Sequence, residues 1–108
     1  MTQESEVKQG DKIIVYVDAE LKELIPGFLE NRHRDIKSIL EALEHIDYKT
    51  IRILGHNMKG SGGGFGFDTI TNIGRSLEQA AEDRDIQEIR RLANELLTFL
   101  ECVDVVYE

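Results

Sequence analysis

Apolar residues recur along most of the chain at intervals of three and four positions, the spacing typical of helices that bury one face. This pattern predicts four helices, near residues 26–46, 48–66, 69–83 and 86–103. The residues expected to face the core are Leu29, Ile36, Ile39, Leu40, Leu43 and Ile46 in the first helix, Ile51, Leu54, Met58 and Phe65 in the second, Ile70, Ile73, Gly74, Leu77, Ala80 and Ala81 in the third, and Ile86, Ile89, Ala93, Leu96, Leu97, Leu100 and Val103 in the fourth.

Polar residues at the expected helix starts support these boundaries. Asp47 and Asp68 precede the second and third apolar stripes, where an aspartate side chain can accept hydrogen bonds from free backbone N–H groups. Asp85, followed three residues later by Glu88, resembles a capping box at the start of the fourth helix. Glycines at 62, 63, 64 and 66 disfavour helix, so we expect the second helix to end within this run.

The two ends of the chain lack the helical pattern. Residues 1–11 have almost no apolar periodicity and are expected to form a flexible tail. Residues 13–17 are β-branched and aromatic, which favours an extended segment, and residues 103–107 either pair with it or prolong the last helix. The expected fold is therefore all-α, an antiparallel up-down four-helix bundle over residues 12–108 with a short extended N-terminal segment.

Composition narrows the classes of partner. The 108 residues are enough for one domain, and a formal net charge of −8 disfavours binding to nucleic acids or anionic lipid. No apolar run approaches the roughly 20 residues of a membrane span, and the N-terminus does not resemble a signal peptide. The single Cys102 suits a reducing compartment. We therefore expect a cytoplasmic, monomeric protein whose partners are proteins.

The candidate chemistry centres on one histidine of the second helix. His56 lies on the side opposite the apolar stripe, so its imidazole should be exposed. Its helical neighbours are the cations Arg52 and Lys59 and the glycines Gly60 and Gly63. A neutral imidazole is a competent nucleophile, and nearby cations can stabilise phosphoryl oxygens. This combination indicates phosphoryl transfer to His56.

Simpler interpretations stay open for some of these residues. His56 considered alone could be an ordinary surface histidine, and His33 and His45 lie among charged residues that suggest solvent exposure. The order Lys59-Gly60-Ser61 does not match a nucleotide-binding P-loop. No His or Cys spacing indicates a metal site, and the acidic residues are spread over all four helices as on a solvated surface.

The sequence His56-x-x-Lys59-Gly60-Ser61, followed by Gly66, resembles the signature of histidine-containing phosphotransfer (HPt) domains of two-component phosphorelays. The similarity extends over the helical pattern before and after the motif, roughly residues 24–102. Gly55 departs from the alanine that is common before the histidine in that family.

The resemblance implies a four-helix phosphocarrier without catalytic activity of its own. His56 would accept a phosphoryl group from an aspartate of a response-regulator receiver domain and pass it on, with a sensor or hybrid histidine kinase at the head of a bacterial relay. Lys59 would support the phosphoryl group and Gly60 would keep the face open. No cofactor is expected on this chain, because the partner supplies magnesium.

The surface around His56 is the expected partner-binding face. Ile53 should be an exposed apolar residue on this side of the helix, and the residues assigned to the face are Arg52, Ile53, Gly60, Gly63 and Gly64. Two alternative functions remain: a non-phosphorylated adaptor or inhibitor of a kinase or receiver domain, and the phosphotransfer module of a larger kinase.

Overall fold

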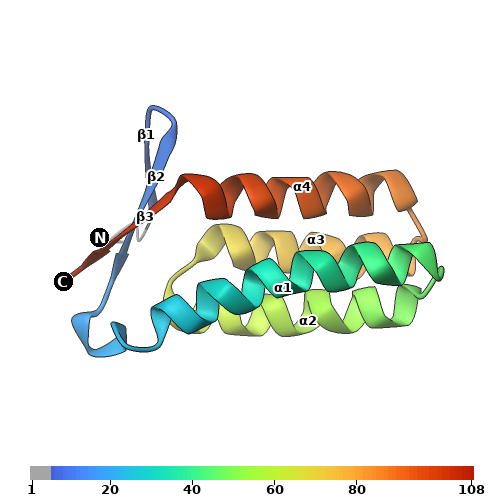
Figure 1. Ribbon diagram of the computed structural model, residues 1–108, viewed down its shortest axis with the longest axis horizontal. Coiled ribbons are helices and arrows are strands. Elements are labelled where there is room, and N and C mark those ends of the chain that lie inside the picture. The colour runs from blue at the N-terminus through green and yellow to red at the C-terminus, as the bar shows by residue number, and fades with distance from the viewer. Residues whose placement is uncertain (1–5) are drawn as a thin grey trace.

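A computed structural model describes residues 6–108 of the chain. Within these residues the long helices are α1 (Ile25–Glu44), α2 (Tyr48–Phe65), α3 (Asp68–Glu82) and α4 (Ile86–Cys102). They lie side by side, and the chain turns back at each short connection (Figure 1). Helices α1 and α3 each pack on both α2 and α4, so the four helices enclose one core. None of the described helices is long and apolar enough to cross a membrane.

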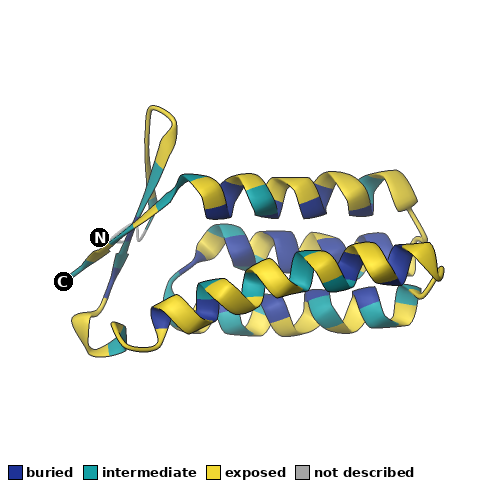
Figure 2. Ribbon diagram, viewed as in Figure 1, coloured by how far each residue is buried: buried dark blue, intermediate teal, exposed yellow. Residues whose placement is uncertain are grey.

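The core follows the expected apolar stripes, with three exceptions. Figure 2 shows that the buried residues lie along the inward faces of the helices. Leu40, Ile46 and Ile86 were expected to face the core and are instead 45%, 67% and 41% exposed. Ile46 lies in the turn after α1 with a positive φ of 53°, and Ile86 is the first residue of α4, so neither continues the stripe of its helix. Leu40 lies at the outer border between α1 and α4.

Two of the three aspartate caps expected at the starts of the long helices are confirmed. The Asp47 side chain accepts a hydrogen bond from the backbone N–H of Thr50 (3.1 Å), and Asp85 accepts one from Glu88 (3.1 Å). The assignment of Asp68 as a cap is wrong, because Asp68 is the first residue of α3 and Phe67 occupies the N-cap position.

A residue from the N-terminal segment caps α3 instead. The Glu6 carboxylate accepts hydrogen bonds from the backbone N–H of Thr69 (2.8 Å) and from the Thr69 hydroxyl. The first N–H groups of a helix have no partner within the helix, so the Glu6 carboxylate serves as the N-terminal capping acceptor of α3.

Helix α2 continues through the first three glycines of its C-terminal run. It ends at Phe65, and Gly66 adopts the left-handed conformation (φ 85°) with its N–H directed to the carbonyls of Gly62 and Gly63. Glycine is the residue best suited to this conformation at a helix end. The expectation that the helix ends within residues 62–66 is therefore confirmed.

Strands at one end of the bundle show that the all-α prediction was too narrow. Within the described residues, β1 (Glu6–Gln9), β2 (Lys12–Val17) and β3 (Val103–Tyr107) form a sheet in the order β1-β2-β3 (Figure 1). β1 is antiparallel to β2, and β3 is parallel to it, from Ile13 opposite Val103 to Val17 opposite Tyr107. Val15 and Val17 join the helical core.

The sheet also shows which structure the two ends of the described chain adopt. Residues 103–107 pair with 13–17, which was one of the two possibilities, and do not prolong α4. The expected flexible tail of residues 1–11 is corrected, because residues 6–9 form a strand; residues 1–5 lie outside the described part of the chain. Asp18 then caps a short 3₁₀ helix (Ala19–Leu21) that leads into α1.

Candidate functional site

The candidate nucleophile lies in the middle of α2 on the solvent side. Ile51 and Met58, on the opposite side of the helix, are completely buried. The His56 side chain is 64% exposed. The apolar stripe of α2 fixes the rotation of the helix in the bundle, and this rotation directs His56 outward.

A carboxylate from the neighbouring helix joins His56 to Lys59. Glu78 of α3 lies with Oε2 at 3.0 Å from His56 Nδ1 and with Oε1 at 2.8 Å from Lys59 Nζ. The Lys59 and Glu78 side chains are only 33% and 21% exposed, so this acid-base pair is partly shielded from water while the imidazole is not.

The hydrogen bonds of Glu78 keep its carboxyl group ionised. The bond from Lys59 is the largest influence and lowers the pKa of Glu78 below its ordinary value of 4.5; partial burial opposes this, and the bond from His56 adds to it. An ionised carboxylate can only accept hydrogen bonds. His56 must therefore carry its proton on Nδ1, which leaves the Nε2 lone pair as the nucleophilic position of the neutral ring.

The other residues assigned to the partner-binding face are all exposed in α2. Ile53 is 44% exposed, and a Cβ atom added at Gly60 or Gly64 would meet no atom within 4 Å. A Cβ at Gly63 would lie 3.7 Å from the Thr71 hydroxyl of α3, an ordinary contact. These glycines therefore leave open surface beside His56. Arg52 is exposed as well, and no ion pair involves it within residues 6–108.

Glu78 is the residue that sequence reasoning missed. The acidic residues are spread over all four helices as on a solvated surface, and nothing local relates Glu78 to a histidine 22 positions earlier. A signal was available, because Glu78 follows the buried Leu77 and lies one helical turn after Gly74, at the edge of the face that α3 presents to α2.

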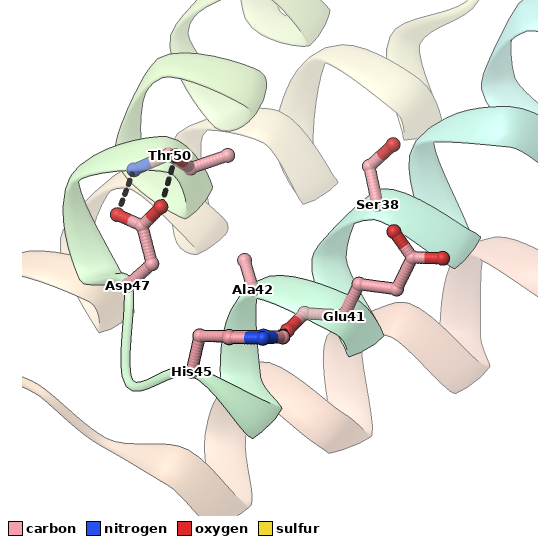
Figure 3. A pocket seen from close by; sticks show the side chains of 6 residues that line it. All are labelled: Ser38, Glu41, Ala42, His45, Asp47 and Thr50. Atoms are coloured by element: carbon pink, nitrogen blue, oxygen red, sulfur yellow. Dashed lines mark hydrogen bonds between the residues drawn. The ribbon is translucent and has the colours of Figure 1, made fainter.

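A second histidine lies beside a pocket at the turn between α1 and α2. Figure 3 shows this pocket, lined by Ser38, Glu41, Ala42, His45, Asp47 and Thr50. Both carboxylate oxygens of Asp47 bond to Thr50, and His45 Nδ1 lies 2.9 Å from the Glu41 carbonyl oxygen. These hydrogen bonds cap the start of α2 and close the end of α1. None of them places a lysine beside the His45 imidazole.

No residues of the described chain suggest a metal centre. Among residues 6–108, no group of three or more His, Cys, Asp and Glu side chains is arranged to hold a metal ion. At His56 the structure presents an exposed imidazole with one oriented nitrogen, an adjacent ammonium group and an uncrowded surface.

Comparison with known proteins places the chain in a family. The model of the family described as "Hpt domain" matches residues 23–103. No curated protein and no solved structure matches the chain. The family match covers α1 to α4 and leaves β1 and β2 outside it. Because the match spans most of the chain, this protein belongs to the Hpt domain family.

Proposed function

We propose that this protein is a phosphorelay intermediate that accepts a phosphoryl group on His56 from a receiver-domain aspartate and passes it to another. The observation that carries the proposal is the hydrogen bond between His56 Nδ1 and Glu78, on an imidazole that is 64% exposed. This bond presents Nε2 to an incoming partner. Membership of the Hpt family supports this role. It also supports an antiparallel up-down arrangement of the four helices.

The transfer step uses the orientation of the ring. The Nε2 lone pair of His56 attacks phosphorus of the receiver's aspartyl phosphate, an N–P bond forms, and the P–O bond to the aspartate breaks. The electron pair of the broken bond stays on the aspartate carboxylate. The imidazole keeps its Nδ1 proton and gains positive charge, which the adjacent Glu78 carboxylate stabilises. The reverse step returns the phosphoryl group to an aspartate.

The remaining site residues assist without forming covalent bonds. Lys59 Nζ, 2.8 Å from Glu78, lies one turn from His56 and can turn toward phosphoryl oxygens on Nε2. Gly60, Gly63 and Gly64 give the receiver access, while Ile53 and Arg52 offer it an apolar and a cationic contact. Magnesium belongs to the receiver, and a sensor or hybrid histidine kinase supplies the phosphoryl group upstream in the cytoplasm.

The deciding experiment is phosphorylation of the purified protein by a phosphorylated receiver, followed by intact mass measurement near neutral pH. The wild type should gain one phosphoryl group that is lost in acid. His56→Gln should gain none, and His45→Gln, which changes the exposed histidine at the α1–α2 turn, should behave as the wild type does. Phosphorylation of His56→Gln would show that the acceptor has been misassigned. Stable receiver binding without any phosphoryl transfer to the wild type would instead favour an adaptor.

A further inference from the structure

Helices α2 and α3 are in close backbone contact where two glycines face each other. A Cβ atom added at Gly74 would lie 2.5 Å from the backbone nitrogen of Lys59 and 2.7 Å from the Gly55 carbonyl oxygen. One added at Gly55 would lie 2.7 Å from the Gly74 carbonyl oxygen and 2.8 Å from the backbone nitrogen of Glu78. The obstructing atoms are mainly helix backbone, so the helices would have to separate to admit even a methyl group.

The atoms at this contact belong to the residues of the site. Gly55 immediately precedes His56, the nitrogen that faces Gly74 is that of Lys59, and the nitrogen that faces Gly55 is that of Glu78. The backbone contact therefore lies directly beneath the two hydrogen bonds of the Glu78 carboxylate, 3.0 Å to His56 and 2.8 Å to Lys59.

We propose that Gly55 and Gly74 are positioning residues, which hold α2 and α3 at the distance where Glu78 can bond to His56 Nδ1 and Lys59 at once. To bring a Cβ at Gly74 from 2.5 Å to an ordinary contact of 3.4 Å, the helices must move apart by most of that difference. A hydrogen bond of 3.0 Å stretched by a similar amount lies beyond the range in which it is effective. The consequence for phosphoryl transfer rests on the proposed function of His56; the consequence for the imidazole does not.

A third glycine provides a matched control. A Cβ at Gly62 would lie 2.7 Å from the Thr71 hydroxyl and 2.8 Å from the Thr71 backbone nitrogen, in the same helix pair but nearly two turns from Gly55. Gly62→Ala should therefore disturb the packing of α2 on α3 without acting directly beneath Glu78. Gly27→Ala in α1, where a Cβ meets no atom within 4 Å, controls for a change in helix propensity alone.

The experiment compares Gly74→Ala with Gly62→Ala in two measurements on the full chain, below the melting temperature of both variants. The first is the ¹⁵N NMR spectrum of the imidazole, which reports the nitrogen that carries the proton. The second is the rate of phosphoryl transfer from a phosphorylated receiver. Gly74→Ala should shift the His56 proton population away from Nδ1 and slow transfer on the order of 10- to 100-fold, as expected for a misplaced catalytic group. Gly62→Ala should lower the melting temperature but leave the tautomer and the transfer rate close to wild type.

A double-mutant cycle tests whether Gly74 acts through Glu78. If it does, Gly74→Ala should add little to the loss of transfer already caused by Glu78→Ala. Should Gly74→Ala fail to fold, Gly55→Ala, which presses on the other side of the same contact, takes its place in both measurements.

The results separate this inference from the proposed function. A wild-type tautomer and transfer rate in folded Gly74→Ala or Gly55→Ala would overturn the inference and assign both glycines to packing alone. A wild type that takes no phosphoryl group would overturn the proposed function, and the imidazole spectrum would still decide the role of the glycines.

Discussion

At the scale of single residues, one carboxylate joins the proposed nucleophile His56 to the neighbouring Lys59. Glu78 bonds to His56 with one carboxylate oxygen and to Lys59 with the other. Replacing either His56 or Lys59 therefore changes the hydrogen bonding of the carboxylate that the remaining residue contacts. The Lys59 ammonium group is therefore paired with Glu78 in this structure and is not a free cation. In the proposed mechanism its ammonium group moves from Glu78 toward the phosphoryl oxygens as negative charge arrives at Nε2.

Replacing Lys59 should reveal this coupling in the titration of Glu78. The Lys59 hydrogen bond is the main cause of the lowered pKa, so Lys59→Ala should raise the pKa of Glu78 toward 4.5, as measured by ¹³C NMR of its carboxyl carbon. A carboxyl with a lowered pKa in the folded state stabilises the fold above 4.5, and this contribution is lost as the pH falls through the lower folded value. The stability difference between wild type and variant should therefore shrink below pH 4.5.

The same variant should slow phosphoryl transfer while keeping the fold, because a partly exposed ion pair contributes little to stability. Lys37→Ala removes an exposed cation from α1 and serves as the control. If Lys59→Ala transfers phosphoryl groups at the wild-type rate in both directions, Lys59 has no part in the chemistry.

At the scale of elements, the contacts that could be predicted from the sequence are those made within a few residues. The apolar period locates the helices, and Asp47 and Asp85 cap helices that begin next to them. The contacts that could not be predicted join distant residues: Glu6 caps α3 across 63 positions, and Glu78 reaches His56 across 22. A local pattern carries no information on such pairs, because they depend on how the helices and the sheet are assembled.

The strand β1 illustrates the same limit. With Val7 as its one apolar residue, it has no alternation that would predict a strand, and it is held by pairing with β2 and by the bonds from Glu6 to Thr69. The position of Glu78 differs in one respect, because Gly74, which has no Cβ, lies one turn earlier and marks the place where α2 comes near.

Removing the distant cap should loosen the start of α3. Glu6→Ala deprives the Thr69 backbone N–H and hydroxyl of their acceptor, and the loss of such a cap costs about 1 kcal/mol of stability. Amide hydrogen exchange should accelerate at Thr69 while the middle of α3 stays protected. Lys8→Ala, an exposed change on the same strand, should affect neither. Unchanged protection of Thr69 in Glu6→Ala would mean that the carboxylate does not cap the helix in solution.

At the scale of the whole molecule, the arrangement leaves one long side of α2 accessible. The sheet lies at one end of the bundle, and the pocket of Figure 3 lies at the turn between α1 and α2 (Figure 1). The chain carries a formal net charge of −8, but the residues exposed around His56 include Lys49 and Arg52. In the proposed function, a receiver that brings a phosphorylated aspartate to His56 would therefore meet cations at this face.

The shape of this face can be tested by filling it. Gly60→Leu places a side chain where a Cβ meets no atom within 4 Å, and leucine has a higher helix propensity than glycine, so the fold should be kept or slightly stabilised. The leucine should nevertheless obstruct a receiver that has to descend over His56 one turn away. Circular dichroism and thermal melting check the fold, and phosphorylation is then compared between a phosphorylated receiver and a small-molecule phosphodonor such as phosphoramidate.

Loss of phosphorylation by the receiver alone would locate the obstruction in docking, because the small donor still reaches Nε2 of His56. Loss with both donors would mean that the leucine covers the imidazole itself, so that the open surface serves the nucleophile more than the partner. Normal transfer from the receiver to folded Gly60→Leu would contradict the open-face account, since an added side chain beside His56 would then cost nothing. In that case the glycines of α2 would be explained by the close contacts of Gly55 and Gly62 with α3 and by the turn at Gly66, all of which require glycine for reasons internal to the fold.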